Sequence, residues 1–310
     1  MKFFKISIWV AIISAVILTI VYLALINGYS RYYTFEQSKL REIIKGNEKF
    51  DILFIGSSRT LYHVNPKIID SALNCNSYNA GVDGARLPEM NLMFKSYLVN
   101  HPPPEIVVAD LSTTAFCLDE NAFFNPNIYY PWLSNDIVYN SIAPYKRVGL
   151  LKNLPFLQLT EWDDHMLQGA IIGLTGKKKI LPADYKGHLK SGEDTIVLPF
   201  KMRYLTTNWP VHTSGISLLD EIITLCKKNH IKLIFTYSPV YQLKDEVVNE
   251  EFFPTVERIR AENEIPFLNY RHLPMNGDHL RFRDEHHLNT NGADIYSRLL
   301  AADLKTFARM

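Results

Sequence analysis

Two short segments far apart in the chain carry side chains suited to nucleophilic catalysis. Gly56-Ser57-Ser58-Arg59 directly follows the apolar run 51–55, which predicts a buried strand ending at a serine hydroxyl. A serine hydroxyl is a poor nucleophile at neutral pH, so it needs a general base, and the base needs a carboxylate that holds its tautomer. Asp284-Glu285-His286-His287 supplies both, because an aspartate three residues before a histidine can reach its Nδ1 while Nε2 faces another strand end.

Alternating strands and helices are expected to position these segments. Apolar strands that alternate with amphipathic helices predict a parallel sheet covered on both faces, with the active site beyond the strand C-termini. A helix-compatible stretch at 34–47 precedes the first strand. The predicted strands are 51–55, 76–80, 105–111, 231–237 and 266–270, and the predicted helices are 88–100, 217–229, 245–263 and 291–307.

The order of these motifs resembles that of the SGNH/GDSL hydrolases. Three blocks carry the resemblance: Gly-x-Ser at 56–58, the turn Asn79-Ala80-Gly81-Val82-Asp83-Gly84, and Asp284-x-x-His287 followed by Leu288-Asn289. Residues 51–308 resemble these hydrolases throughout, apart from an insertion. The resemblance implies an α/β fold, a three-layer α/β/α sandwich with a mainly parallel, flavodoxin-like sheet.

The resemblance also implies roles for individual residues. Ser58 would be the nucleophile, His287 the general base and Asp284 its orienting partner. The backbone amides of Ser58 and Gly84 would form part of an oxyanion hole, which stabilises the charge of the tetrahedral intermediate. No cofactor and no metal ion is expected for this chemistry.

Two departures from the family pattern bear on activity. Ser57 stands where the first block usually has Asp, and Asp110-Leu111-Ser112-Thr113-Thr114 stands where the third block usually offers an Asn donor to the oxyanion. Loss of one such donor costs about 10²- to 10³-fold in rate. We therefore interpret Ser112, Thr113, Thr114, Asn79 and Arg59 as candidate oxyanion or substrate contacts.

Alternative interpretations of single residues remain open. Ser57 is an alternative nucleophile, and Arg59 is equally suited to a phosphate or carboxylate ligand and to a structural ion pair. The side chains of His272, His279, His286, His287 and Asp278 suggest a metal cluster, but their spacing fits no His-x-x-x-His helix site.

The N-terminus predicts a membrane anchor. Residues 6–26 form an uncharged run of 21 residues, about 31 Å long as a helix, which is enough for one bilayer crossing. The run is longer than a typical cleaved signal peptide and lacks a small-x-small exit. Lys2 and Lys5 favour a cytoplasmic N-terminus at 1–5, although the basic residues Arg31, Lys39 and Arg41 weaken this asymmetry. We therefore expect a single-pass protein of the inner or plasma membrane, with its catalytic domain outside the cytoplasm.

The remaining chain divides into segments that differ in amino-acid composition. Residues 27–50 predict a membrane-proximal linker and helix, 51–112 and 214–310 the hydrolase-like domain, and 113–213 an aromatic-rich insertion or cap. With 33 Lys plus Arg against 32 Asp plus Glu, net charge gives no case for nucleic-acid binding. Cys75, Cys117 and Cys226 are too few and too scattered for a disulfide scaffold.

The variant Gly-Ser-Ser-Arg block resembles membrane-anchored branches that handle acyl groups on bacterial envelope polymers. These include polysaccharide O-acetyltransferases and the esterase-like protein of teichoic acid D-alanylation. The expected function is therefore a serine esterase or O-acyltransferase whose substrate is an envelope glycan or glycopolymer, with other membrane proteins of an acylation or export system as further partners. The missing Asn motivates the alternative of an inactive binding or assembly protein in polysaccharide export or modification.

Overall fold

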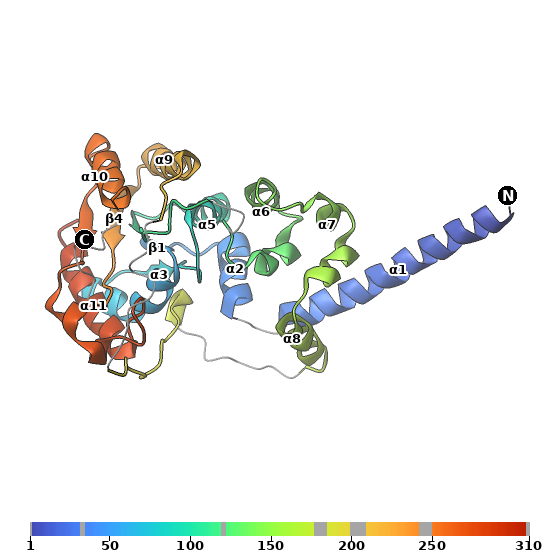
Figure 1. Cartoon of the computed structure of the whole chain (residues 1–310), viewed down its shortest axis with the longest axis horizontal. Helices are drawn as coiled ribbons and strands as arrows, with labels where there is room; N and C mark the ends of the chain where they lie inside the picture. The colour runs from blue at the N-terminus through green and yellow to red at the C-terminus, as the bar shows by residue number, and fades with distance from the viewer. Residues whose placement is uncertain are drawn as a thin grey trace. The chain divides into compact units, whose positions relative to one another are not determined.

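The computed structural model describes residues 2–31, 35–118, 122–176, 185–198, 209–241 and 250–307 (Figure 1). The chain divides into two compact units. The first contains residues 1–38 and 125–182, and the second contains residues 39–124 and 183–310. Each unit is described separately below.

A five-stranded parallel sheet forms the centre of the second unit, in the order β2-β1-β3-β4-β5. Its strands are β1 (Ile52–Gly56), β2 (Ser77–Asn79), β3 (Ile106–Asp110), β4 (Lys232–Tyr237) and β5 (Phe267–Asn269). Gly56, Asp110 and Thr236 stand side by side in register, so β1, β3 and β4 end at one common edge. This strand order is the flavodoxin-like order, and the predicted fold class is confirmed.

Helices cover both faces of the sheet. On one face α4 (Pro66–Leu73) and α11 (Thr290–Leu304) pack against the side chains of Ile52, Phe54 and Val108 in one core cluster. On the other face α5 (Leu87–Asn100) contacts β1 and α9 (Thr213–Lys228) contacts β4. The buried, aliphatic strand residues explain why both faces must be covered. Two further helices of this unit are α2 (Phe35–Lys45), which begins in the first unit, and α10 (Phe252–Glu262).

Two helices between β1 and β2 were not predicted from the sequence, which indicated only a turn there. α3 (Ser58–His63) and α4 have six and eight residues, too short to show a clear helical period. A capping signal for α4 does exist: Asn65 accepts a bond from Lys67 N at 3.1 Å, Pro66 begins the helix, and Asn74 ends it in the left-handed conformation. The start of the predicted helix 245–263 lies outside the described residues.

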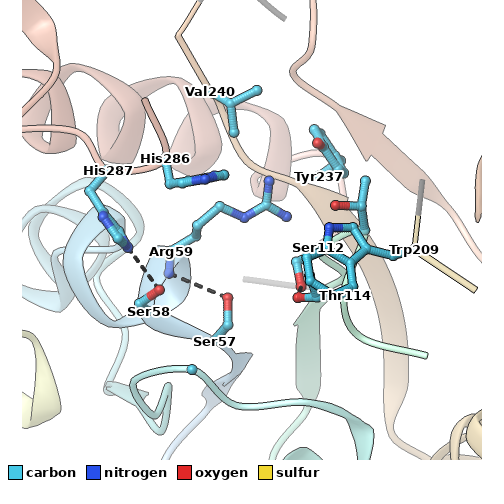
Figure 2. A pocket seen from close by; sticks show the side chains of 12 residues that line it. Ser57, Ser58, Arg59, Ser112, Thr114, Trp209, Tyr237, Val240, His286 and His287 are labelled. Atoms are coloured by element: carbon cyan, nitrogen blue, oxygen red, sulfur yellow. Dashed lines mark hydrogen bonds between the residues drawn. The ribbon is translucent and has the colours of Figure 1, made fainter. Parts of the chain in front are cut away.

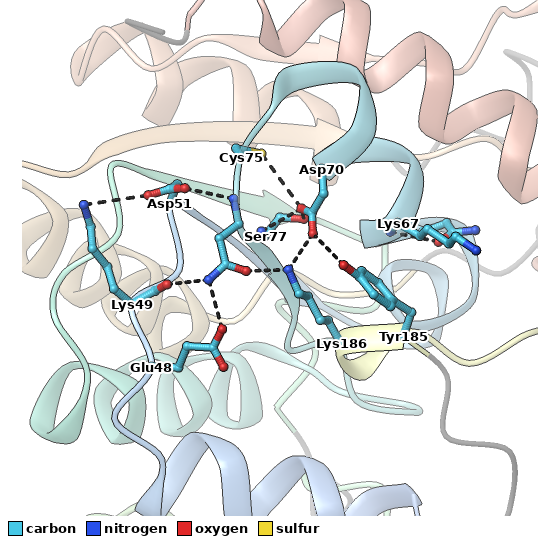
Figure 3. Close-up of polar contacts among 11 residues, drawn as sticks. Glu48, Lys49, Asp51, Lys67, Asp70, Cys75, Ser77, Tyr185 and Lys186 are labelled. Atoms are coloured by element: carbon cyan, nitrogen blue, oxygen red, sulfur yellow. Dashed lines mark hydrogen bonds and ion pairs between the residues drawn. The ribbon is translucent and has the colours of Figure 1, made fainter.

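The boundaries between the two compact units do not coincide with the ends of the predicted insertion, residues 113–213. Both ends of that segment pack on the sheet unit, because Phe116 meets Phe252 edge to face and Ile196 joins the core cluster. Short 3₁₀ turns in the same unit are η3 (Tyr185–Gly187), η5 (Pro274–Gly277) and η6 (His279–Arg281). Figure 3 shows how Lys186 of η3 reaches Asp70, to which Ser77 also donates.

The first unit is helical. It contains α1 (Lys2–Arg31), η1 (Pro126–Trp132), α6 (Asp136–Ile142), α7 (Gly149–Asn153), η2 (Pro155–Glu161) and α8 (Asp164–Leu174). Among the described residues, one helical stretch, Phe3–Tyr29, is long and apolar enough to cross a membrane. A signal sequence near the N-terminus passes the same test of length and composition.

Candidate active site

Ser58 occupies the first turn of α3, directly beyond the end of β1. Ser57 caps this helix: its hydroxyl accepts a bond from Arg59 N at 3.4 Å, and its carbonyl accepts one from Leu61 N at 3.0 Å. The edge at which β1 ends is the edge where parallel sheets place their sites. Figure 2 shows the Ser58 hydroxyl directed at the His287 ring.

His287 and Asp284 share a tight loop that precedes α11. Arg283 N donates to His287 O at 2.9 Å, and Phe282 and Leu288 form an isolated antiparallel bridge. The loop therefore doubles back on itself. This turn brings a carboxylate and an imidazole that are three residues apart onto the same side of the loop.

The three groups are connected by hydrogen bonds. Asp284 Oδ1 lies 2.9 Å from His287 Nδ1 and also accepts bonds from the amides of His286 and His287 at 2.9 and 3.0 Å. On the other side of the ring, His287 Nε2 lies 2.8 Å from Ser58 Oγ. Carboxylate, imidazole and hydroxyl thus stand in the order that general-base activation of a nucleophile requires.

Electrostatics keep the Asp284 carboxylate ionised. Burial alone would raise the pKa of Asp284, but hydrogen bonds from His287 and from the His286 amide, together with the nearby Arg283 charge, hold that pKa well below its usual range. An ionised carboxylate only accepts hydrogen bonds, so the proton of the neutral ring stays on His287 Nδ1 and is donated to Asp284. Nε2 is then free of its proton and accepts the bond from the Ser58 hydroxyl.

His63, the last residue of α3, holds the loop that carries the imidazole. Leu288 N donates to His63 Nε2 at 3.0 Å, and the His63 and His287 rings meet edge to face with centroids 6.3 Å apart. Burial holds the pKa of His63 well below its ordinary value, so Nε2 stays unprotonated and available as an acceptor. One short helix therefore carries both Ser58 and the acceptor that positions the base.

His63→Leu is expected to lower kcat about tenfold or more with little change in KM. The substitution leaves the buried Leu288 amide without its acceptor, at a cost of about 1–3 kcal/mol, and frees the neighbouring imidazole to rotate. His63→Gln places a carbonyl oxygen near the position of Nε2 and should restore part of kcat. Steady-state kinetics of both variants on an activated ester measure this, and equal losses in the two variants would assign His63 to packing alone.

Ser58 and His287 line a pocket of about 310 Å³ (Figure 2). Gly84 also lines it, with φ at +64°, and a Cβ there would lie 2.3 Å from the Phe124 side chain, so both backbone and space require glycine. The two predicted oxyanion donors, Ser58 and Gly84, thus belong to one pocket. The other lining residues are Ser57, Arg59, Ser112, Thr113, Thr114, Trp209, Tyr237, Val240 and His286.

The segment after β3 contributes hydroxyl groups to this pocket. Ser112, Thr113 and Thr114 all line it, and the Ser112 and Thr114 hydroxyls are hydrogen-bonded at 3.0 Å. This is the segment where the resemblance leads one to expect an Asn. This segment therefore offers side-chain hydroxyl groups to the pocket in place of the side-chain amide of an Asn.

Arg59, which follows β1, contacts residues at the ends of β3 and β4. The residue is 4% exposed, its Nη2 donates to Leu111 O at 3.0 Å, and its Nε lies 3.6 Å from Asp110 Oδ2. The guanidinium carbon lies 4.3 Å from the centroid of the Tyr237 ring. Asp110 is itself held by Ser238, whose amide and hydroxyl donate to it at 2.8 and 3.1 Å. Of the two interpretations of Arg59, this geometry favours the structural ion pair.

Arg59→Met is expected to lower the free energy of unfolding by about 3–5 kcal/mol, because it leaves the buried Asp110 carboxylate without its counter-charge. The double variant Arg59→Met/Asp110→Asn should recover part of this loss. Urea unfolding of the three proteins measures both effects. Unchanged stability combined with a raised KM would contradict the structural interpretation and assign Arg59 to ligand binding.

The side chains of two sequence candidates make other contacts than their candidate roles require. Asn79 is fully buried and does not line the pocket: its amide donates to Thr60 O at 2.7 Å and Val64 O at 2.8 Å, and its Oδ1 accepts from Gly81 N. This corrects its candidate role, because the amide is committed to the backbone of α3. Ser57 does line the pocket, but its hydroxyl caps the helix, whereas His287 contacts Ser58.

Several residues in or next to the pocket were missed by sequence reasoning. Tyr237 ends β4, and its position at the C-terminal end of a predicted parallel strand was the available signal. Val240 lies just beyond the same strand. Trp209 lies in the aromatic-rich insertion, where nothing in the sequence distinguishes one aromatic residue from another. His63 carries no local signal at all, because its partner Leu288 is 225 residues away.

The histidines weighed as a metal cluster do not gather. Within the parts of the chain that the structure describes, no three His, Cys, Asp or Glu side chains are placed to hold an ion. His286 instead lines the pocket, with its Nε2 3.7 Å from Glu285 Oε1. Burial, with help from His287, lowers the pKa of His286 to about 4, so this ring is neutral at neutral pH.

Two of the solved structures that match this chain have low sequence identity to it. No family model and no curated protein matches the chain. One solved structure, a provisionally assigned acylhydrolase from Bacteroides fragilis, is 13% identical with a TM-score of 0.43, over 88% of this chain and 95% of the other. Another, a provisionally assigned lipolytic protein of the G-D-S-L family from Desulfitobacterium hafniense, is 10% identical with a TM-score of 0.42, over 82% and 99%. The fold assignment above rests on the strand order, and the chemistry rests on the distances within the site.

Proposed function

We propose that this protein is a membrane-anchored serine esterase or O-acyltransferase that acts on acyl esters of a cell-envelope polysaccharide or glycopolymer. The observation that carries the chemistry is the 2.8 Å contact between Ser58 Oγ and His287 Nε2, with Asp284 2.9 Å from Nδ1. This order of groups activates a hydroxyl for attack on a carbonyl carbon.

In the proposed reaction Ser58 Oγ bonds to the ester carbonyl carbon while its proton passes to His287 Nε2. The carbonyl electron pair moves to oxygen, and the amides of Ser58 and Gly84 stabilise that oxyanion. The intermediate then collapses, the bond to the alcohol breaks, and His287 returns the proton to the leaving alcohol. The acyl group remains on Ser58 until water or a sugar hydroxyl gives its proton to His287 and attacks the acyl carbonyl carbon. The bond to Ser58 Oγ then breaks, and His287 returns the proton to that oxygen.

The substrate class is inferred from the setting of the pocket. The apolar helix α1, with Lys2 and Lys5 at its start, favours a single-pass anchor with the pocket outside the cytoplasm. Trp209 offers an aromatic surface in the pocket wall against which a sugar ring or an acyl chain can pack. A C-terminal reporter fusion tests the topology, and a cytoplasmic readout would contradict an envelope substrate.

A fluorophosphonate probe tests the chemistry. The folded full-length protein should be labelled at one serine and should hydrolyse an activated acyl ester such as p-nitrophenyl acetate. Adding a glycan acceptor should divert product from free acid to acylated glycan if the protein is a transferase, and should leave the free-acid yield unchanged if it is an esterase. A folded protein that shows neither labelling nor turnover would contradict both.

The alternative function is a catalytically inactive binding or assembly protein in polysaccharide export or modification. The observation that favours it is the segment Ser112 to Thr114, which brings hydroxyl groups where an Asn donor is expected. Under this alternative the pocket still binds the polymer. Biological complementation by Ser58→Ala, together with absent labelling of the wild-type protein, would select it.

A further inference from the structure

Helix α8 packs one apolar face against the C-terminal part of α1. Met166 and Ala170 form a buried cluster with Tyr29, whose ring lies 5.5 Å from that of Trp162. The backbones approach closely at Gly28, where a Cβ would lie 2.2 Å from Ala170 O. Glycine is therefore required at this crossing, and α8 is held against α1 within one compact unit (Figure 1).

The apolar side of α8 extends beyond this contact and is partly exposed there, with Leu174 at its border, since a Cβ at Gly28 would lie 2.7 Å from Leu174 Cγ. Leu167, Ile171 and Leu174 recur at intervals of four and three residues, so they lie on one side of the helix. Their side chains are 42%, 50% and 44% exposed, and the exposed polar residue Gln168 borders them. The outward side of a surface helix is ordinarily polar, so this cluster of aliphatic side chains marks a contact surface.

The position of α8 along α1 indicates what covers this face. The uncharged run 6–26 matches a hydrocarbon core of about 30 Å, and its side chains are mostly exposed up to Leu23. Protein begins to cover α1 at Tyr22, which is buried and donates to Gln158 Oε1 at 2.9 Å. The crossing at Gly28 lies six residues, or about 9 Å, further along. Helix α8 therefore packs where the run leaves the acyl chains.

We propose that α8 is an interfacial helix, which lies at the surface of the bilayer that α1 crosses and buries Leu167, Ile171 and Leu174 among the acyl chains. Interfacial helices insert an apolar face about 5–10 Å deep in this way. Leu25 and Ile26 pack against the same crossing and stay partly exposed, so the apolar surface of α1 continues onto α8. The inference rests on the membrane-anchor part of the proposed function and is independent of its chemistry.

Single-cysteine variants of the full chain in proteoliposomes test the proposal. In a background with Cys75, Cys117 and Cys226 replaced by Ser or Ala, the environment-sensitive dye NBD is attached at Ile171→Cys, at the control Gln168→Cys or at Ile13→Cys within the span. We expect NBD at residue 171 to be quenched by lipids with a nitroxide near the head of the acyl chain, and NBD at residue 13 by a nitroxide near the chain end. NBD at residue 168 should be quenched by aqueous iodide. Far-UV circular dichroism melting curves confirm that each variant is folded.

Other outcomes overturn the proposal in distinguishable ways. Iodide quenching at residue 171 as strong as at 168, with residue 13 still in the acyl region, shows an anchor without an interfacial helix. Shielding of residue 171 from both quenchers shows that a second copy of the chain covers this face. Iodide quenching at residue 13 shows that α1 does not span, which removes the anchor and leaves the esterase chemistry to its own test.

Discussion

Ser58→Ala is expected to abolish fluorophosphonate labelling and to lower kcat by about 10⁴- to 10⁶-fold, because removal of the nucleophile ends covalent catalysis. The Ser58 side chain is the one that the His287 imidazole contacts, at 2.8 Å. Loss of this hydroxyl should change stability little, since Ser58 is half-buried at the start of a helix. Labelling, single-turnover kinetics and urea unfolding of the variant measure these three effects.

Ser57→Ala is the matched control, because it removes a neighbouring hydroxyl in the same pocket. The Ser57 hydroxyl caps α3, so its loss should cost about 0.5–2 kcal/mol of stability while labelling persists. The opposite pattern, with labelling lost in Ser57→Ala and kept in Ser58→Ala, would make Ser57 the nucleophile. Labelling of both variants would place the reactive group elsewhere in the chain.

Asp284→Asn is expected to lower kcat by about 10⁴-fold with little change in the binding of substrate. The carboxylate accepts from His287 Nδ1 and from two backbone amides, and an amide side chain cannot accept at both of its positions. An Asn that presents its NH₂ group to Nδ1 favours the tautomer with the proton on Nε2, which cannot take the Ser58 proton. Steady-state kinetics measure the loss, and a fall below tenfold would contradict this orienting role.

The same substitution should alter the pH dependence of stability. The pKa of Asp284 is held below its usual range in the folded protein, so the unfolded chain binds more protons once the pH falls to about 4. Its contribution to stability is therefore present above about pH 4 and is lost as the pH falls toward the folded-state pKa. Urea unfolding between about pH 6 and pH 3 should show a shallower decline for Asp284→Asn than for the wild-type protein, and parallel curves would contradict the shifted pKa.

Most of the sheet unit could be predicted from local patterns. The apolar runs 105–111 and 231–237 became β3 and β4, because a strand buried on both faces must be aliphatic along its whole length. Helices α3 and α4 escaped prediction because six to eight residues show too little of a helical period. Their stability comes from packing and from caps. Of these, the sequence shows only the cap of α4 at Asn65 and Pro66.

The candidate site could likewise be predicted only where its contacts are local in sequence. The spacing of Asp284 and His287 is local, and the structure brings both groups together with Ser58 at the sheet edge. The tether from Leu288 N to His63 is a contact between distant parts of the chain, so no spacing rule could find it. Asn79 was one of several candidate contacts, because an amide that bonds to a helix backbone and one that faces a ligand look identical in sequence.

The order of the site residues along the chain also constrains when the site can form during synthesis. Chains are made from the N-terminus, so α1 and Ser58 leave the ribosome first, and the imidazole follows 229 residues later. Helix α11, which packs against α3 and α4, is made later still. A nascent or truncated chain that lacks this last segment therefore carries an unactivated serine and an uncovered sheet face. The contact between Ser58 and His287 can therefore form only after almost the whole chain has been made.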